Sequence, residues 1–558
     1  MEKEFHIAAW RVDPQGNRVW RGDRSHHLEP RAMDLLVYFA QRPNEILSRD
    51  QIFRDVWKGA NVGESALHTA ISALRRTFDD DPRQPRIIET IPKRGYRLIA
   101  TTTALGAAVA VLPFRDLSMT GDRGFPADGF SDLLISELGR VPGIRVIAWT
   151  SVSSFRNTQI SIKEIAGKLG ARYIVEGSVL RSGERVRVSA RLIDPRDGTQ
   201  LWANAFDREL EELLSMQRRV ADDIASAVSS RIRPRRAPLL EPTGRSKALV
   251  AYTRGRFHWY KLSAEHLDRA EEYFEESIAL DPSFGPAYAG VADVWGARGY
   301  WGMLPMQFVR DKVWAPLHRA EPISDKWGEI QVLMAAASFL FEKDWEATES
   351  HLRRAIRLNP NLAQAHHVYG LFAITLKRAD AVDWIDTAAR LDPLNPSIQL
   401  ARALLAMSQN EDREALQYVQ RVLELDSAHP PANRVRANLA WLLKDSSAPK
   451  YEARLWTDDG EITALFDADE NRAFDSSVLL RIGKLLRSRS RNQYVQPLQL
   501  ARTFSLGGDA ETALDILEDA YEADDLMPIV FLQSDCAWHP LRSHPRFRKL
   551  LSEIGLPA

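Results

Sequence analysis

The chain has 558 residues, of which 27% are charged, and its formal net charge at pH 7 is −1. This length exceeds what one hydrophobic core can hold, so we expect about three or four domains. The near-zero net charge excludes a polyelectrolyte, and any contact with nucleic acid must come from a local basic patch. The single cysteine, Cys536, excludes an internal disulfide framework and a multi-cysteine metal site.

The chain shows neither a secretion signal nor a membrane helix. Its first ten residues, MEKEFHIAAW, lack the apolar core of a signal peptide. The longest apolar run, Ala104–Phe114, has about half of the 18–20 residues that a membrane helix needs, and its β-branched content favours a buried strand. We therefore expect a cytoplasmic protein with no membrane partner.

Residues 1–100 combine strands with three helices. The alternation in Phe5–Ala9, the turn residues 14–17 and the apolar pair Val19-Trp20 predict a hairpin. Pro30 suits the first position of a helix, and Ser48 is a suitable N-cap for a second helix. Two helices joined by a short turn, the second with a polar face, are typical of a helix-turn-helix unit.

The third predicted helix is Glu64–Phe78, and it has two different faces. Its apolar stripe consists of Leu67, Ile71, Leu74 and Phe78. The other face carries Ser65, His68, Thr69, Ser72, Arg75 and Arg76. Short side chains allow close approach to a DNA major groove, hydroxyl and imidazole groups reach base edges, and guanidinium groups bind phosphate or guanine. For this helix alone, an ordinary amphipathic helix with a solvated face is an equal alternative.

A basic hairpin follows the third helix. After the turn at residues 79–81, Ile87–Ile91 and Tyr96–Ile99 predict a two-stranded ribbon whose tip is Pro92-Lys93-Arg94-Gly95. The alternative for Lys93 and Arg94 is a solvated turn. Residues 1–100 hold 17 basic and 14 acidic side chains, a balance of +3. This charge is modest, so we expect dimers or tandem sites to tighten DNA binding.

Three segments give this region a family resemblance: LSRDQIFRDVW (47–57), ALHTAISALRRTF (66–78) and GYRL (95–98). They resemble the OmpR/PhoB-type winged-helix output domain, in the version used by CadC/ToxR/HilA-like regulators. The resemblance implies a recognition helix in the major groove and a wing over the adjacent minor groove or backbone. The implied groove contacts are Ser65, His68, Thr69, Ser72, Arg75 and Arg76, and the implied wing contacts are Lys93 and Arg94. We find no phosphate-receiving domain ahead of the winged helix, so we expect regulation by another route than receiver phosphorylation.

Residues 105–232 predict an α/β domain. The expected strands are Val109–Phe114, Ile144–Ala148, Tyr173–Val179, Arg185–Ile193 and Gln200–Ala203. The expected helices include Ile162–Leu169, Leu210–Ile232 and one capped by Asp128 and Ser131. The segments AVLPFRDLS, FPADGFSDLLISEL, ARYIVEGSVLRSGERVRVSARLID and GTQLWANAFDREL resemble the TolB N-terminal-like domain. This resemblance implies a fold. It also implies the kind of domain found next to it, which is tetratricopeptide repeats or, on other chains, a nucleotide cyclase domain. It implies no chemistry, because the family has no agreed activity.

Nucleotide and metal motifs are weak in this domain. Gly167-Lys168 lacks the spacing of a phosphate-binding loop, and we expect a helix end there with Gly170 as the stop. Asp128 and Asp132 are interpreted as helix-start carboxylates rather than a metal pair.

The remaining chain predicts a linker and a helical solenoid. Residues 233–247 contain three prolines and five basic residues, so we expect an extended connector, with a secondary contact to DNA as the alternative. In residues 248–558, Pro360 and Pro393 are 33 residues apart, and Pro393 and Ser427 are 34 apart. The pattern resembles tetratricopeptide repeats, which implies a curved solenoid whose concave side holds a peptide or protein.

Two features of the repeats are left open. The register breaks at Trp295–Asp325 and Asp445–Ser477, which are irregular repeats or insertions. The aromatic tracts Arg256–Lys261 and Trp295–Trp314 either line the concave surface or pack in the core.

No catalytic arrangement emerges from the sequence. The two histidines in each of the adjacent pairs His26-His27 and His366-His367 point to different sides of their element, so they cannot bind one metal ion well. Cys536 lies near His539 and His544, but closeness in the sequence does not place a general base beside the thiol. We therefore expect no enzymatic activity, no metal and no cofactor.

The sequence as a whole predicts a multidomain α+β protein that regulates transcription. The expected partners are double-stranded promoter DNA, RNA polymerase, a protein or peptide on the repeats, and a second copy of the chain on DNA. The alternative is a repeat scaffold whose main role is protein–protein interaction. A third reading gives the α/β domain a nucleotide-linked role.

Overall fold

The computed structural model describes residues 5–557 except 8–9, 22–23, 43–44, 58–63, 84, 101, 105–107, 119–126, 142, 183–184, 210–211, 229–245, 262, 301, 325, 457–458, 468–475 and 527–528. The predicted linker, 233–247, lies outside the described residues except for its last two, which begin a helix. Among the described residues no helix is both long and apolar enough to cross a membrane.

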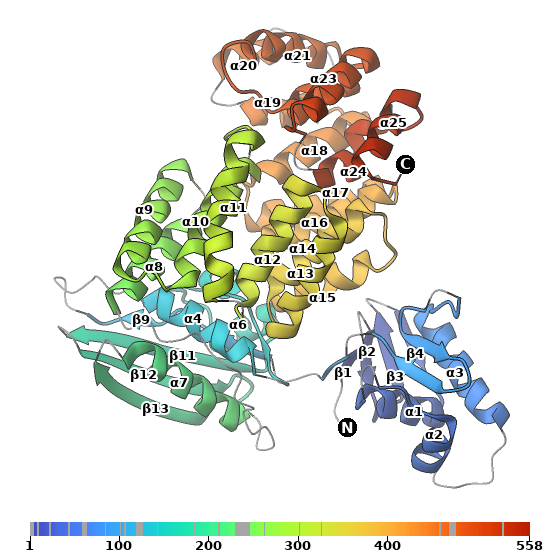
Figure 1. Ribbon diagram of the computed structural model, residues 1–558, viewed down its shortest axis with the longest axis vertical. Coiled ribbons are helices and arrows are strands. Elements are labelled where there is room, and N and C mark those ends of the chain that lie inside the picture. Colours follow the sequence, from blue (N-terminus) through green and yellow to red (C-terminus); the bar gives the residue numbers. More distant parts are fainter. Residues whose placement is uncertain are drawn as a thin grey trace.

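The N-terminal unit is a sheet packed on three helices, followed by a hairpin (Figure 1). Its strands are β1 (Phe5–Ile7), β2 (Trp10–Asp13), β3 (Arg18–Arg21), β4 (Arg24–His27) and β7 (Thr102–Ala104). They are antiparallel neighbours in the order β4-β3-β2-β1-β7. The helices are α1 (Pro30–Ala40), α2 (Arg49–Val56) and α3 (Glu64–Phe78), and the hairpin is β5 (Ile88–Ile91) with β6 (Gly95–Leu98).

Local signals set the bounds of these helices. Pro30 stands at the start of α1, as expected. Ser48 is confirmed as the N-cap of α2, because its hydroxyl accepts from the backbone N–H of Gln51 while the Gln51 side chain accepts from the Ser48 N–H. The sheet joins the helices through Trp10, whose ring meets Phe78 edge-on at 5.3 Å. The hairpin prediction is incomplete, because a four-strand meander replaces it and β7 returns after residue 100 to pair with β1.

The central domain is a mixed sheet with helices on its faces. Its strands are β8 (Ala108–Val111), β9 (Arg115–Asp116), β10 (Arg145–Val146), β11 (Tyr173–Ser182), β12 (Arg185–Asp194) and β13 (Thr199–Glu209). The order is β10-β8-β11-β12-β13 with β9 beside β11; β8, β9, β10 and β11 are parallel, and β12 and β13 are antiparallel. The helices are α4 (Ala127–Gly139), α5 (Trp149–Ser153), α6 (Ile162–Leu169) and α7 (Leu213–Val228).

Several details of this domain differ from the sequence prediction. Strand β13 extends to Glu209 because it pairs with β12 along its whole length. The strand expected at Ile144–Ala148 shrinks to Arg145–Val146, since α5 begins at Trp149. Ser131 lies inside α4, where its hydroxyl donates to Ala127 O and accepts from Phe114 N. Gly170 is confirmed as the stop of α6, with a left-handed φ of 58°.

The C-terminal region consists of antiparallel helix pairs. The first five pairs are α8 (Ser246–Trp259) with α9 (Ala264–Leu280), α10 (Gly285–Tyr300) with α11 (Met306–Ile323), α12 (Gly328–Ala337) with α13 (Trp345–Leu358), α14 (Ala363–Thr375) with α15 (Ala381–Leu391), and α16 (Pro396–Ser408) with α17 (Asp412–Leu425). A π-helical turn, Ser338–Glu342, extends α12. Later helices are α18 (Pro430–Leu442), α19 (Ala448–Ala453), α20 (Gly460–Asp467), α21 (Ser477–Arg489), α22 (Pro497–Gly507), α23 (Ala510–Glu522), α24 (Ile529–Ser534) and α25 (Pro545–Ile554).

The two register breaks have different origins. The first, Trp295–Asp325, falls on a regular pair, whose second helix α11 tolerates Pro316 and Pro322 inside it. The second, Asp445–Ser477, contains the short helices α19 and α20 in place of a full-length pair.

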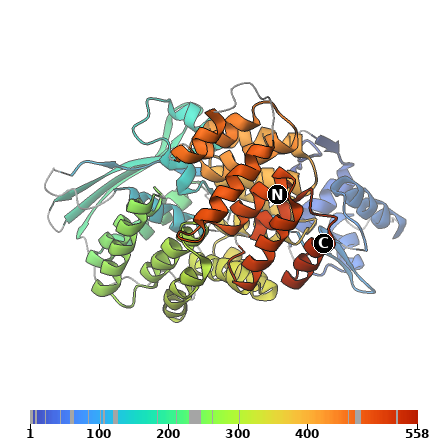
Figure 2. The same ribbon diagram turned by 90° about the horizontal axis from the view of Figure 1, so that it is seen from above.

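The α/β domain lies against the repeats (Figures 1 and 2). Asn361, in the turn before α14, donates to Gly139 O at 2.7 Å and to Ile144 O at 2.9 Å, and accepts from Val146 N at 3.1 Å. Ala148 N donates to Leu391 O at 2.8 Å. Side chains of α4, α5, α8, α10, α12, α14 and α16 line one shared cavity, so the first helices of the pairs face the chain's own α/β domain.

Candidate nucleic-acid interface

The polar face of α3 points away from the core. Leu67, Ile71, Leu74 and Phe78 are buried among the sheet and the other helices. Five of the six predicted groove residues are exposed: Ser65, His68, Thr69, Ser72 and Arg76. The Thr69 hydroxyl donates to Ser65 O at 2.9 Å, which leaves its lone pairs free to accept. This face presents the donors and acceptors that a major-groove reader needs.

The sixth residue, Arg75, is half-buried and links α3 to the hairpin. Its Nη2 donates to Ile88 O and to Thr90 Oγ1, both at 2.9 Å. The structure therefore places Arg75 in a bridge between helix and wing rather than with the exposed face. Sequence reasoning missed this role because Arg75 and Arg76 are adjacent and chemically identical, and only the position of β5 distinguishes them.

A buried carboxylate fixes the start of the wing. Asp80, only 5% exposed, accepts backbone N–H groups of Arg86, Ile87 and Ile88 at 2.6, 3.1 and 2.8 Å. Asp80 belongs to the acidic turn that the sequence predicts between α3 and β5. The turn was expected, but its use as an anchor for three backbone donors was not.

Gly95 allows the wing to reach the start of α2. The backbone of Tyr96 pairs with Leu47 through two hydrogen bonds of 2.9 and 3.0 Å. Gly95 has φ +133°, and a Cβ there would overlap the carbonyl oxygen of Leu47. Only glycine both adopts this positive φ readily and leaves room for the Leu47 carbonyl oxygen. The ring of Tyr96 is buried, and its hydroxyl lies 3.5 Å from Nδ1 of His68 on α3.

The wing tip presents two cations on a tight turn. Arg94 N donates to Ile91 O at 3.0 Å, with Pro92 and Lys93 at the two central positions. Lys93 has φ +62°, a left-handed conformation that costs a non-glycine residue about 1 kcal/mol or more. Lys93 and Arg94 are both exposed. Arg97, which the sequence analysis did not single out, is instead paired with Glu89 at 2.5 Å on the neighbouring strand.

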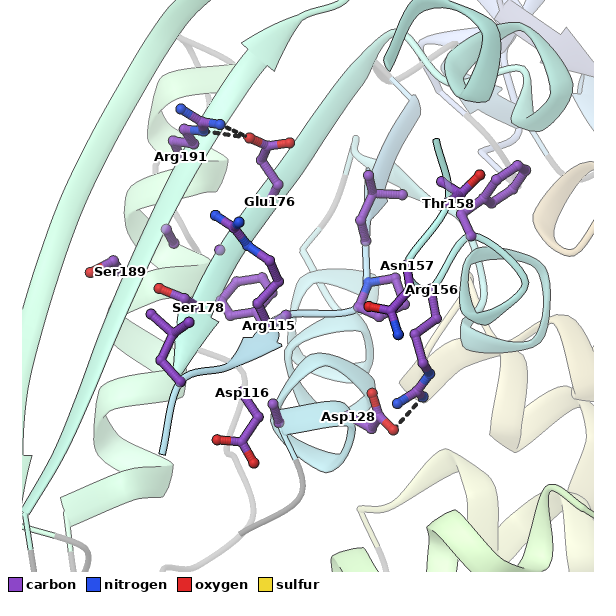
Figure 3. Close-up of a pocket in the computed structure, with 18 of the residues that line it drawn as sticks. Arg115, Asp116, Asp128, Arg156, Asn157, Thr158, Glu176, Ser178, Ser189 and Arg191 are labelled. Carbon is purple, nitrogen blue, oxygen red and sulfur yellow. Dashed lines mark hydrogen bonds and ion pairs between the residues drawn. The ribbon is translucent and has the colours of Figure 1, made fainter. Parts of the chain in front are cut away.

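A second candidate site is an open cleft of about 1310 Å³ on the central sheet (Figure 3). Its polar lining includes Arg115, Asp116, Asp128, Arg156, Asn157, Thr158, Glu176, Ser178, Ser189 and Arg191. Arg156 pairs with Asp128, and Arg191 pairs with Glu176. Burial raises the pKa of Asp128, although the Arg156 guanidinium opposes this shift. Most of the charge in the cleft is thus compensated within the wall.

Other predicted groups in the α/β domain have structural partners. Gly167-Lys168 lies inside α6, not at a strand-to-helix turn. Asp132 accepts from the Tyr260 hydroxyl at 3.0 Å. The residues that the structure describes contain no cluster of three or more potential metal ligands.

Comparisons with known proteins agree with the geometry of the N-terminal unit. Residues 23–98 match the family model described as "Transcriptional regulatory protein, C terminal". The chain is 44% identical over 94 residues to the transcriptional activator CadC of Escherichia coli (strain K12), covering 17% of this chain and 18% of CadC. It is 19% identical over 386 residues to the transcriptional regulator HilA of Salmonella typhimurium, covering 67% of this chain and 68% of HilA.

A further relative is named as an enzyme. The chain is 30% identical over 187 residues to putative adenylate cyclase 3 of Rhizobium meliloti (strain 1021), covering 33% of this chain and 32% of the cyclase. The chain thus spans about a third of that relative and less than a fifth of CadC. At the level that the family model reaches, residues 23–98 belong to the OmpR/PhoB-type DNA-binding domains of transcriptional regulators.

Proposed function

We propose that this chain is a sequence-specific DNA-binding regulator of transcription. In this proposal α3 binds in the DNA major groove and the wing contacts the adjacent DNA backbone. One observation carries the proposal: Arg75 links α3 to β5 of the wing, and Gly95 lets the wing pair with Leu47 just before α2, so both contact surfaces are held in one geometry. A preorganised surface binds DNA without first having to order itself. The similarity to CadC and HilA supports the same function.

The residues divide into three roles in this proposal. Base edges are contacted by Ser65, His68, Thr69 and Ser72 on α3. Phosphates are contacted by Arg76 on α3 and by Lys93 and Arg94 on the wing. Arg75, which the sequence analysis places among the groove contacts, positions the wing relative to α3 and contacts DNA only from that fixed position.

Two further kinds of partner are proposed, a second copy of the chain and other proteins. The first is suggested by the modest net charge of residues 1–100, and the second by the long repeat region. A balance of +3 over residues 1–100 supports binding by two copies on tandem or inverted half-sites. We further propose that the repeats bind a protein partner and that the DNA-bound chain contacts RNA polymerase. The alternative function, a scaffold whose repeats capture partners, draws support from the extent of the helical region.

Charge reversal at the wing tests the proposal. We expect the full-length double variant Lys93→Glu, Arg94→Glu to bind promoter DNA at least about tenfold more weakly at low salt, and to show a shallower salt dependence, because two phosphate contacts are lost. Arg18→Glu is the matched control, since Arg18 is exposed on the sheet that packs against the apolar side of α3. Equal DNA affinity of the double variant and the control would favour the scaffold.

A further inference from the structure

A cavity of about 410 Å³ separates α4 and α5 of the α/β domain from the first helices of the repeat pairs. Binding sites for small molecules usually measure about 300–1,000 Å³. The walls include Ser136 on α4, Trp259 on α8, Gly296 on α10, Trp327 before α12 and His367 on α14. The space therefore belongs to both domains at once, and it is distinct from the DNA-binding surface.

Small residues and aromatic side chains line this cavity. On α10, Ala289, Gly296 and Ala297 face the cavity, and a Cβ added to Gly296 would meet no atom within 4 Å. The aromatic lining consists of Trp149, Tyr252, Trp259, Tyr260, Tyr300, Trp327, Phe339 and Phe341. Part of the predicted aromatic tract Arg256–Lys261 thus lines this cavity, namely Arg256, Trp259 and Tyr260. Trp295, by contrast, donates to Glu271 at 2.8 Å between α9 and α10.

The central cation of the cavity is already compensated. Arg256 Nη1 donates to Asp293 at 3.2 Å, and its Nη2 donates to the Tyr260 hydroxyl at 2.7 Å. Its Nε lies 3.8 Å from Asp132, and its guanidinium lies 4.7 Å above the ring of Trp259. An anionic ligand would have to displace these carboxylates from Arg256, so the wall disfavours an anionic occupant, and the aromatic lining favours an uncharged one.

Three buried polar atoms of the lining have no hydrogen-bond partner in the described part of the chain: Trp259 Nε1, Trp327 Nε1 and Glu329 Oε2. The other oxygen of Glu329 accepts from Ser136 on α4 at 2.9 Å. A buried polar group without a partner is destabilising, so a ligand that supplies the partner gains affinity. These three atoms belong to residues that line the cavity, and they are the two N–H donors and the one acceptor that an occupant would have to reach.

We propose that this interdomain cavity binds an uncharged, ring-containing small molecule. Acceptor atoms of the ligand take the N–H groups of Trp259 and Trp327, and a hydroxyl or amide donor of the ligand meets Glu329. Because both domains form the walls, the bound molecule stabilises their association. The inference depends on the cavity alone and holds whether or not the winged helix reads DNA.

The first test fills the cavity. Prodan (6-propionyl-2-dimethylaminonaphthalene) is a neutral bicyclic fluorophore with a carbonyl acceptor, and its emission shifts to the blue in an apolar site. We expect saturable binding of one prodan per full-length chain. Gly296→Leu places a side chain in the empty space and should abolish this binding. Gly167→Leu is the matched control, because a Cβ on Gly167, in α6, also meets nothing within 4 Å but faces no part of this cavity.

The second test removes one orphan donor and remains informative if Gly296→Leu fails to fold. Trp327→Phe keeps an aromatic ring but loses the indole N–H, so we expect roughly fivefold weaker prodan binding in the folded variant. Absence of saturable binding to the wild-type chain would overturn the proposal. Wild-type affinity in folded Gly296→Leu, or in Trp327→Phe, would overturn it too.

Discussion

At the scale of single residues, the orientation of the wing depends on a position where only a hydrogen atom fits. Gly95 combines a φ of +133° with close contact to the Leu47 carbonyl. We expect Gly95→Ala to destabilise the N-terminal unit by about 2–3 kcal/mol, from strain and steric overlap together. It should also weaken DNA binding, because the wing shifts. Thermal unfolding and DNA titration of the full chain measure both effects.

Gly198 supplies the control for this prediction. It also has a positive φ, +76°, but a Cβ there meets nothing within 4 Å. Gly198→Ala should therefore cost only about 1 kcal/mol, from backbone strain, and should leave DNA binding unchanged. If the two substitutions had the same effect on stability, the steric part of the argument would be wrong.

A buried histidine gives the repeats a pH dependence. Burial lowers the pKa of His366 to about 4, opposed by the hydrogen bond from Nε2 to Pro360 O. An unfolded histidine has a pKa of about 6.5, so between these values the unfolded state binds more protons than the folded state. His366 therefore supports the fold fully above about pH 6.5 and loses about 1.4 kcal/mol per pH unit as the pH falls toward 4.

His366→Gln removes this titration and keeps a donor for Pro360 O. We expect its thermal midpoint to fall less than that of the wild type between neutral pH and about pH 5.5. His367, whose pKa burial also lowers to about 4, keeps its own titration in both proteins. Parallel pH profiles of wild type and variant would contradict the assignment.

At the scale of elements, α3 and the hairpin act as one unit because Arg75 connects them. We expect Arg75→Met to lower stability by about 1–2 kcal/mol, since Ile88 O and Thr90 lose their donor. Arg76→Met should leave stability unchanged and weaken DNA binding, because Arg76 is exposed. Thermal unfolding beside DNA titration separates the two roles, and a stability loss for Arg76→Met as large as for Arg75→Met would refute them.

Helical periodicity predicted the elements that position the DNA-binding surface. The spacing of Leu67, Ile71, Leu74 and Phe78 identified α3, and the sequence Pro92–Gly95 identified the turn of the wing. Strands β4 and β7 were missed, because the four-residue RSHH and the three-residue TTA show no apolar alternation. Such strands exist through pairing with a distant neighbour, β7 with β1, and local sequence does not encode that partner.

At the scale of the whole molecule, the α/β domain and the repeats share a polar seam as well as a cavity. Asn361 makes three hydrogen bonds across this seam, to Gly139, Ile144 and Val146. No sequence signal marks it, since asparagine is common in the turn between repeat pairs. Sequence reasoning did not anticipate that the chain's own α4 and α5 lie against the first helices of the repeat pairs.

We expect Asn361→Ala to loosen this seam without unfolding either domain. The loss of three hydrogen bonds should weaken the association by about 2–3 kcal/mol. Faster hydrogen exchange at the backbone of residues 144–148 would report the loosening. Asn433→Ala is the control, because the side-chain bonds of Asn433 stay within α18 and the turn before it: Nδ2 donates to Ser427 O and His429 O, and Oδ1 accepts from Arg436. Equal exchange in both variants would show that Asn361 does not hold the domains together.

The proposed function rests on sequence readout by α3, and selection from a pool of random-sequence duplexes tests it most directly. The full-length chain is incubated with the pool at low salt, and bound duplexes are recovered and sequenced over several rounds. We predict enrichment of one short motif, present in two copies at a fixed spacing of about one helical turn, and its loss when Ser72 and Arg76 are replaced by alanine. Recovery of duplexes with no common motif would contradict sequence-specific binding by this chain.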